Sequence, residues 1–422
     1  SPLSPSSAAS DVYKRQEKLD YGKGYSLVEV QAPYGYVLDS TPVSFDVTEE
    51  NSTQEGGITL IKVDKPNMAQ KGTISVEKTG EEFFGVNVFG EKDKDVIYQP
   101  VYTVKGLAGA VYEITADEDI ITPDGTLRYH KGDVVDTVTT DDEGFAKSKE
   151  LYLGKYTVVE IKAPNGMVIN NEKHSVELTY AGQDVAVTET VTSFYNERQK
   201  VKISLEKVLE QNDTFGIGTN DEIKNISFGL YAKEDIVSSS GTVIPAEGLI
   251  EIITLDENGT AIANTDLPFG SYYIKEIATD EHYILSDTQY PFTFEYAGQD
   301  TEIVEIKVND GKPIENKLIY GSVSGKKIDE NGEALGGALI GIFKADESEF
   351  TKEHAIMTAT SEKDGSFSFA KVPYGQWIVR EIEAPTGFVL DDTSYEVNIS
   401  KNEQVIEVEI ANEYIHGNIQ LT

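Results

Sequence analysis

The chain has 422 residues and a formal net charge of −37, from 73 acidic and 36 basic side chains. This length exceeds what one hydrophobic core usually organises, so we expect several domains of roughly 100 residues each. The acidic balance, without a basic cluster to neutralise phosphates, excludes nucleic acid as a partner and disfavours an anionic membrane surface.

Composition narrows the class of protein further. Hydrophobic residues make up 39% of the chain, with 23 Tyr and 16 Phe, which is too rich for a disordered acidic segment. There is no cysteine, so disulfides, thiol chemistry and thiolate metal sites are excluded. No apolar run approaches the roughly 18 residues needed to cross a bilayer, so we predict no direct membrane insertion.

The beginning of the chain divides into two segments. Residues 1–16 are rich in Ser, Ala and Pro and join abruptly to strand-like sequence, which predicts a non-native or disordered leader. Residues 17–70 contain the phrase Tyr25-Ser-Leu-Val-Glu29, then the turn Ala32-Pro-Tyr-Gly35, and later Asn67. We predict a partial domain over 17–70.

The phrase aromatic, any, aliphatic, any, Glu then recurs at regular intervals, which indicates a repeat. The turn Ala-Pro-x-Gly follows it at 163–166 and 384–387, whereas the third copy has Ala278-Thr-Asp-Glu-His282 instead. A turn rich in Asp, Glu, Asn and Gly precedes each of the last three copies, at 141–144, 256–259 and 362–365, as expected where a hairpin reverses. The later copies of the phrase are Tyr156-Thr-Val-Val-Glu160, Tyr272-Tyr-Ile-Lys-Glu276 and Trp377-Ile-Val-Arg-Glu381.

A lysine closes an alternating phrase at the start of each later repeat. Because successive strand side chains point to opposite faces, each lysine shares a face with the residues two and four places before it. Those residues are apolar apart from Gly325, so each lysine is predicted to face the core. The phrases are Ile74-Ser-Val-Glu-Lys78, Ile203-Ser-Leu-Glu-Lys207 and Val323-Ser-Gly-Lys-Lys327.

An asparagine closes a strand at the end of each repeat, at Asn196, Asn316 and Asn412. Lys207 and Lys327 each follow the preceding asparagine by 11 residues, and Lys78 follows Asn67 by the same step. This spacing predicts complete domains at 71–199, 200–319 and 320–416, and a truncated opening strand at 417–422. The many short strands and close joints predict all-β, Ig-like antiparallel sandwiches in an elongated array. Two insertions, 82–104 and 117–136, are expected to be loops or hairpins.

Each complete domain therefore places a Lys, a Glu and an Asn at core-facing positions on its first, middle and last strand. Burial pushes an amine toward its neutral, nucleophilic form. A protonated Glu could hydrogen-bond the asparagine carbonyl and shuttle a proton while the amine attacks and ammonia leaves. The alternative for one such trio is a buried ion pair with an amide partner. Three complete sets with constant spacing favour the covalent bond.

The same residues resemble a known family. The order Lys, Glu, Asn, together with Leu107-Ala-Gly-Ala-Val-Tyr112, Leu335-Gly-Gly-Ala338, Tyr36-Val-Leu-Asp39 and Phe388-Val-Leu-Asp391, is similar to the prealbumin-like domains of Gram-positive surface proteins. These are the collagen-adhesin B-type repeats, also found in SpaA-type pilins. The resemblance covers nearly all of the chain from residue 17.

The resemblance implies the prealbumin-like fold and a role for each residue. It implies intramolecular isopeptide bonds between the Lys and Asn of each domain, promoted by the middle-strand Glu. Glu29 and Asn67 match the same pattern, but their lysine would precede the sequence, so Asn67 is predicted to lack a lysine partner. The implied sets are Lys78, Glu160 and Asn196; Lys207, Glu276 and Asn316; and Lys327, Glu381 and Asn412.

The predicted function is a structural stalk segment of a cell-wall-anchored adhesin or pilin, outside a Gram-positive cell. Its partners would be neighbouring domains of the same surface protein. The alternative is direct adhesion to a host matrix protein or glycan, most readily through the enlarged 71–199 domain, since binding often uses irregular loops on a rigid scaffold.

Five scattered His and the absence of a phosphate loop or hydrolase triad argue against an enzyme. Acidic clusters at 117–119 and 141–144 lack EF-hand spacing, so neither cofactor nor metal is expected.

Overall fold

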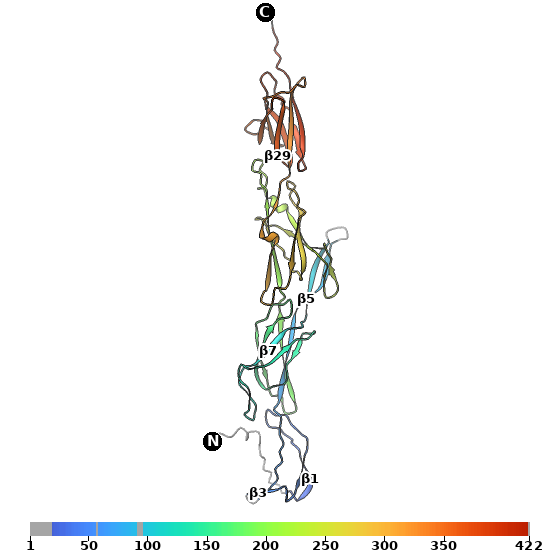
Figure 1. The fold of residues 1–422 in the computed structure, drawn as a ribbon, viewed down its shortest axis with the longest axis vertical. Coiled ribbons are helices and arrows are strands. Elements are labelled where there is room, and N and C mark those ends of the chain that lie inside the picture. Colours follow the sequence, from blue (N-terminus) through green and yellow to red (C-terminus); the bar gives the residue numbers. More distant parts are fainter. Residues whose placement is uncertain (1–18, 56–57, 91–95, 421–422) are drawn as a thin grey trace. The chain divides into compact units, whose positions relative to one another are not determined.

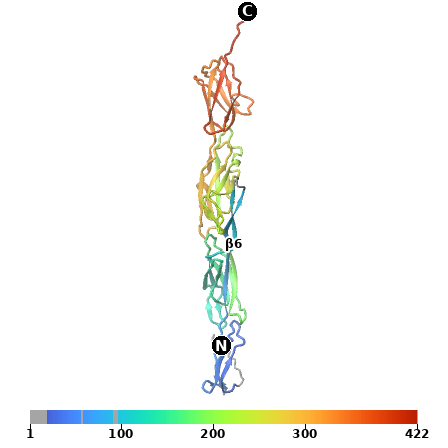
Figure 2. The same ribbon diagram turned by 90° about the vertical axis from the view of Figure 1, so that its right-hand side faces the viewer.

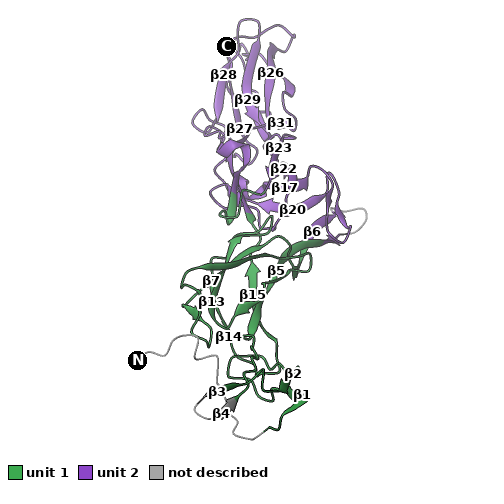
Figure 3. Cartoon of the chain, turned by 60° about the horizontal axis from the view of Figure 1, so that its bottom comes forward, with its two compact units in different colours: residues 1–84, 101–200, 296–304 green, residues 85–100, 201–295, 305–422 purple. Residues whose placement is uncertain are grey.

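The computed structural model describes residues 19–55, 58–90 and 96–420 (Figures 1 and 2). Strands joined by short turns dominate these residues, which confirms the predicted all-β class of tandem sandwiches. The chain falls into two compact units (Figure 3). Unit 1 holds residues 1–84, 101–200 and 296–304, and unit 2 holds 85–100, 201–295 and 305–422.

The 17–70 segment contains two short antiparallel strand pairs. Strand β1 (Gly22–Leu27) pairs with β2 (Val43–Val47), and β3 (Thr53–Glu55) pairs with β4 (Ile58–Leu60). Tyr25 stacks on Phe45 with ring centroids 5.8 Å apart, a cross-strand pair of the kind that stabilises a small sheet.

The 71–199 segment is a two-sheet sandwich. In one sheet, β11 (Phe145–Lys147), β12 (Leu151–Tyr152) and β15 (Val187–Asn196) pair with β5 (Lys71–Phe89). The other sheet has the order β10 (Val134–Thr139), β7 (Val111–Ala116), β13 (Gly154–Lys162), β14 (Lys173–Leu178). Inward-facing side chains such as Ile74, Tyr112 and Val158 form the core between the sheets.

Both insertions of this segment form hairpins. The first consists of the end of β5 and the strand β6 (Ile97–Gly106). The described residues 85–90 and 96–100 of this hairpin belong to unit 2, where Ile97 pairs with Leu249 of β20 (Leu249–Thr254). The second contains β8 (Ile120–Ile121) and β9 (Leu127–Tyr129).

The 200–319 segment repeats the plan. Strand β16 (Lys200–Leu209) pairs with β21 (Thr260–Ile262) and β25 (Ile314–Asn316), and β24 (Ile303–Lys307) belongs to the same sheet. Opposite lie β20, β17 (Ser227–Ala232), β22 (Gly270–Ala278) and β23 (Gln289–Phe294). A hairpin of β18 (Ile236–Val237) and β19 (Val243–Ile244) and two 3-10 turns, η2 (Glu222–Asn225) and η3 (Val308–Gly311), complete the segment.

The 320–416 segment is the most regular sandwich. One sheet has the order β29 (Ser366–Pro373), β26 (Tyr320–Asp329), β32 (Val405–Asn412). The other has the order β28 (Met357–Thr360), β27 (Leu339–Lys344), β30 (Gly375–Glu383), β31 (Tyr395–Ile399). Its core includes Trp377, and Phe215 and Ile217 from the 200–319 segment pack against that core.

One strand pairing recurs in all three sandwiches and departs from the antiparallel pattern. The first and last strands are neighbours and run parallel: β5 with β15, β16 with β25, and β26 with β32. In each pair the lysine lies opposite the residue two places before the asparagine: Phe194, Ile314 and Ile410. Because two residues restore the same face of a strand, this register puts Lys and Asn on one side of the sheet.

Candidate functional site: three buried Lys, Glu and Asn trios

Strand alternation carries each lysine into a sandwich interior, as the sequence pattern predicts. Along β5, Ile74, Val76 and Lys78 are all buried, and β16 and β26 behave in the same way. Lys78, Lys207 and Lys327 have exposed fractions of 1%, 2% and 0%. A lysine is almost never buried so completely unless it has partners.

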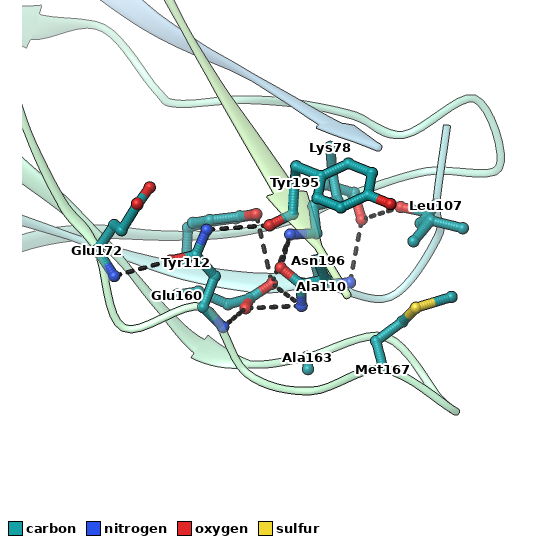
Figure 4. A network of polar contacts seen from close by, with 12 residues as sticks. Lys78, Leu107, Ala110, Tyr112, Glu160, Ala163, Met167, Glu172, Tyr195 and Asn196 are labelled. Carbon is teal, nitrogen blue, oxygen red and sulfur yellow. Dashed lines mark hydrogen bonds and ion pairs between the residues drawn. The ribbon is translucent and has the colours of Figure 1, made fainter. Parts of the chain in front are cut away.

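In the 71–199 domain, the three predicted residues meet and point toward one another (Figure 4). Lys78 Nζ donates a hydrogen bond to Asn196 Oδ1 and lies 3.2 Å from Glu160 Oε1. Asn196 Nδ2 donates to Glu160 Oε1 and Oε2, at 3.1 and 2.9 Å. All three side chains are at least 98% buried, so little water competes for these contacts.

The 200–319 domain has the same arrangement. Lys207 Nζ donates to Asn316 Oδ1 at 2.5 Å and lies 3.2 Å from Glu276 Oε1. Asn316 Nδ2 donates to both Glu276 oxygens, at 2.8 and 2.9 Å, and to Thr279 Oγ1 at 3.0 Å. The trio therefore forms although this domain lacks the Ala-Pro-x-Gly turn.

The 320–416 domain brings the trio together with one difference. Lys327 Nζ lies 3.4 Å from Glu381 Oε1, and Asn412 Nδ2 donates to Glu381 Oε2 at 2.7 Å. Lys327 Nζ donates to the backbone oxygen of Ile410 at 3.3 Å, while Asn412 Oδ1 has no hydrogen-bond partner among the described residues. The amine thus lies beside the last strand, two residues before the asparagine.

The described residues of the 17–70 segment bring the acid and the amide of the pattern together. Asn67 Nδ2 donates to Glu29 Oε1 and Oε2, at 2.9 and 2.8 Å, and to the Val37 backbone oxygen at 3.1 Å. Both side chains are half-buried.

Burial sets the protonation of the lysines. Loss of water around the ammonium lowers the pKa of Lys78, Lys207 and Lys327 from the ordinary value of 10.5, and the neighbouring glutamate only partly opposes this. A lowered pKa increases the share of neutral amine near neutral pH. The neutral amine is the form that can attack a carbonyl carbon.

The glutamate contacts differ from the sequence-based expectation. A protonated Glu was expected to bond the asparagine carbonyl, but in the structure the carboxylate of Glu160 faces Asn196 Nδ2. The carboxyl group of Glu160 therefore contacts both Lys78 Nζ and Asn196 Nδ2. It can take a proton from Lys78 Nζ and give one to the departing Asn196 nitrogen.

A backbone contact that the sequence analysis missed fixes every glutamate. The amide nitrogen ten residues after each Glu donates to its Oε2 atom, at distances from 2.7 to 3.1 Å. That residue is Asp, Asn or Ser in every copy, and its side chain accepts a hydrogen bond from the amide two residues later, so both its type and the constant step of ten could have been noticed. The donors are Asp39, Asn170, Ser286 and Asp391.

The residue facing the glutamate across the sheet differs between domains. Tyr112 lies opposite Glu160, and its hydroxyl is 3.4 Å from Glu160 Oε1. Burial, together with the negative charge of Glu160, raises the pKa of Tyr112, so the phenol stays a donor. Phe228 and Ile340 hold the equivalent positions opposite Glu276 and Glu381, so the hydroxyl is not a shared component.

The predicted hairpin before each glutamate strand is instead a turn from one sheet to the other, into β11, β21 and β29, and its glycine holds the lysine backbone in place. The Lys327 amide donates to the Gly365 oxygen at 2.7 Å, and a β-carbon on Gly365 would lie 2.3 Å from the Lys327 oxygen. Gly144 and Gly259 make the same two contacts with Lys78 and Lys207. All three glycines have positive φ, which side-chain-bearing residues rarely adopt.

We expect Gly365→Ala to destabilise the 320–416 domain by about 2 kcal/mol or more, because a left-handed backbone and a clash combine. Fluorescence of Trp377, the single tryptophan, reports denaturant unfolding of this domain. The control is Gly332→Ala, where φ is also positive but nothing lies within 4 Å of the added β-carbon. Equal losses in both variants would show that close packing against the lysine is unimportant.

The described residues were also compared with the requirements of a metal site and of a membrane-spanning helix. Within residues 19–55, 58–90 and 96–420, no group of three or more His, Asp or Glu side chains is arranged to hold a metal ion. No helix in the described chain is long and apolar enough to cross a membrane.

Comparison with known proteins gives a family. The model of the SpaA prealbumin-like fold domain matches the chain four times, at residues 9–67, 100–192, 215–312 and 321–414. The "Trypsin-resistant surface T6 protein" of Streptococcus pyogenes serotype M6 is 27% identical over 139 residues, which is 32% of this chain and 24% of that protein.

One solved structure shows the same fold. The Bacillus anthracis TIE protein superposes with a TM-score of 0.55 at 21% identity, over 82% of this chain and 51% of that one. BcpA, the major pilin subunit of Bacillus cereus, has a TM-score of 0.35 at 16% identity, over 82% of this chain and all of that one. The chain thus spans about a quarter of the streptococcal relative and about half of the Bacillus anthracis chain.

The four matches cover most of the chain, and the all-β sandwiches agree with them. The chain therefore belongs to the family of SpaA prealbumin-like fold domains, which it carries in tandem.

Proposed function

We propose that this chain is a load-bearing stalk segment of a Gram-positive adhesin or pilin, with each complete domain closed by a Lys to Asn isopeptide bond. One observation carries the proposal. In buried interiors, Lys78 Nζ donates to Asn196 Oδ1 and Lys207 Nζ donates to Asn316 Oδ1. In each pair the lysine is on the first strand of the domain and the asparagine is on the neighbouring last strand.

The bond would form by transamidation, in which the lysine nitrogen replaces the side-chain nitrogen of the asparagine on Cγ. The neutral Lys78 amine attacks Cγ of Asn196, a new N–C bond forms, and the bond from Cγ to Nδ2 breaks. Glu160 accepts a proton from Nζ and returns one to Nδ2, so ammonia leaves and the carboxylate is regenerated. This happens once per domain, without turnover, so the chain is not an enzyme in the usual sense.

The strand arrangement gives the bond its mechanical purpose. Tension along a tandem array enters each domain at its first strand and leaves at its last. A covalent link between those two strands carries the load, and the residues between them stay folded. Bonds in the three complete domains would enclose 118 residues after Lys78, 109 after Lys207 and, by 412 − 327, 85 after Lys327.

Pulling on single molecules tests this function. Lys207→Met should add roughly 380 Å of extension when the 200–319 domain unfolds, since 109 residues are freed at about 3.5 Å each. The wild-type chain should lack this step. Lys202→Met, an exposed lysine on the same strand, is the matched control and should behave as wild type. A wild-type chain that already shows the 109-residue step would contradict a load-bearing bond.

We place the stalk outside the cell, anchored to the wall. The family and the surface protein and pilin descriptions of its relatives support an extracellular position. Its partners would be neighbouring domains and other subunits of the same surface assembly.

Direct adhesion through the 71–199 domain is a second candidate. A hollow of about 460 Å³ lies on its β7 and β13 face, lined by residues that include Glu113, Lys131 and Lys173. Such a surface could hold a host matrix protein or glycan. Binding of the full chain to an array of matrix proteins and glycans, lost in Lys131→Glu, would support it, whereas no binding would leave only the structural role.

A further inference from the structure

A loop of the 71–199 domain is bound by the Ala-Pro-x-Gly turn of the partial domain before it. This glutamine loop, residues 180–184, reads Tyr-Ala-Gly-Gln-Asp. The Ala32 amide donates to Gln183 Oε1 at 2.8 Å, and the Leu38 amide donates to the Gln183 backbone oxygen at 2.9 Å. Residues 32–38 thus form a receiving turn that holds one glutamine by two main-chain donors.

The same contact occurs a second time, also within unit 1. The second glutamine loop, residues 296–300, has the identical sequence Tyr-Ala-Gly-Gln-Asp. Its Gln299 accepts from the Ala163 amide through Oε1 and from the Ile169 amide through the backbone oxygen, both at 2.9 Å. Residues 163–169 are therefore a second receiving turn.

A second glutamine, three residues after the site asparagine, secures the loop from the linker. Gln70 Nε2 donates to the Gly182 and Val185 backbone oxygens, at 2.8 and 2.5 Å, and Gln70 Oε1 accepts from the Ala181 amide. Gln199 contacts the 296–300 loop in the same way, through Gly298, Thr301 and Ala297.

The joint between the 200–319 and 320–416 domains lacks both halves of this contact. Residues 278–282 replace the receiving turn, and the corresponding 400–404 loop contains no Tyr-Ala-Gly-Gln-Asp sequence. Instead the His282 ring meets the Tyr374 ring edge-on at 5.5 Å, and the Ile319 backbone bonds to His282 and Tyr374. Turn and loop therefore occur together or not at all within these joints.

The 320–416 domain carries a receiving turn without a loop. The bond that closes this turn, from the Phe388 amide to the Pro385 oxygen at 3.1 Å, occurs in all four copies, including Tyr283 to Asp280. The Ala-Pro-x-Gly sequence at 384–387 is what this turn shares with the filled copies alone. Among the described residues, nothing accepts a hydrogen bond from the Ala384 or Leu390 amide. Ala384 is half-buried where Ala32 and Ala163 are buried, and Leu390 is exposed where Leu38 and Ile169 are half-buried.

We propose that residues 384–390 are a docking site for a glutamine loop of another prealbumin-like domain. The two loops of this chain are already held by residues 32–38 and 163–169, so the occupant is a loop of the same Tyr-Ala-Gly-Gln-Asp type on a further domain. Ile415 stands where Gln70 and Gln199 stand in the filled joints. Because an isoleucine side chain cannot hydrogen-bond the loop, the docked loop would be held by bonds from the Ala384 and Leu390 amides to its glutamine.

The proposal extends the stalk function, because it names where another domain joins, but it does not depend on isopeptide chemistry. The test uses the full chain labelled with ¹⁵N at Ala and Leu and a cyclised peptide with the sequence of residues 295–301. The Ala384 and Leu390 amide signals should shift, with saturation in the millimolar range expected of so small a contact. The Ala163 signal, already bonded, should not move.

The matched control is the same peptide with Gln299→Ala, which should bind at least about fivefold more weakly because one acceptor is lost. No shift with about 10 mM peptide, or equal shifts with both peptides, would overturn the docking site.

Amide hydrogen exchange of the chain without peptide is a second test of whether the turn is open. The Ala384 amide should exchange at least about tenfold faster than that of Ala163, and equal rates would show that the turn is not open. The mass of the same sample reports the isopeptide bonds separately, so the two proposals fail independently.

Discussion

A chain carrying Lys327→Met together with Glu381→Gln should lose about 5 kcal/mol of stability in its 320–416 domain. Joining residues 327 and 412 closes a loop of 85 residues, and the chain-entropy model for a crosslink of this size gives a figure near 5 kcal/mol. The measurement is denaturant unfolding followed by Trp377 fluorescence. Trp377 lies in this domain's core, so its signal reports this domain.

The double substitution separates the bond from the buried charges. Without a bond, replacing a buried ion pair by neutral side chains of similar size is often neutral or stabilising. A stability change within about 1 kcal/mol, or a gain, would therefore argue that no bond exists in this domain. Lys78→Met with Glu160→Gln, the same change in the other compact unit, is the control and should leave the Trp377 transition in place.

Replacing Glu160 by Gln should slow bond formation in the 71–199 domain by roughly 10²- to 10⁴-fold, the usual contribution of a positioned proton shuttle. Gln keeps the size and the hydrogen-bonding reach of Glu160 but cannot carry a proton from Lys78 Nζ to Asn196 Nδ2. The measurement is a time course of ammonia loss by intact mass, after the chain is refolded from the unfolded, unreacted state.

The control variant is Tyr112→Phe, which removes the 3.4 Å hydroxyl contact to Glu160 and leaves the proton path intact. It should react within about tenfold of the wild-type rate. If Glu160→Gln also reacts that fast, the glutamate does not shuttle the proton and serves only as a structural partner of the lysine.

The wild-type rate should also rise with pH. Only the neutral amine attacks, and burial lowers the pKa of Lys78 from 10.5, so the neutral fraction grows as pH approaches that lowered pKa. Below the lowered pKa the rate should increase about tenfold per pH unit, and above it the rate should level off. A rate that falls with rising pH would show that deprotonation of the amine does not control the reaction.

Strand alternation is why so much of the site could be predicted from sequence. The residues two and four places before Lys78 are Ile74 and Val76, and their burial fixes the direction of the lysine. The phrase ending in Glu160 works in the same way, because Tyr156 and Val158 are buried on the glutamate's face of β13. A repeated pattern with constant spacing then assigns the partners.

The rest depends on contacts between distant strands, which a periodic pattern does not encode. The parallel pairing of β5 with β15 could not be read from either strand, and the bond from the Asn170 amide to Glu160 joins a strand to a loop beyond the reach of strand alternation. The departure at residues 278–282 looked like an irregular copy of the turn. The structure relates it to the joint, because the next domain has no glutamine loop for a receiving turn to hold.

Intact mass of the folded, purified chain shows whether the three isopeptide bonds form. The mass should be lower than the sequence mass by three ammonia molecules, with one restored in each of Lys78→Met, Lys207→Met and Lys327→Met. Peptide mapping should then recover Lys78 linked to Asn196, Lys207 to Asn316 and Lys327 to Asn412. A mass equal to that of the sequence, with all three lysines free, would contradict the account.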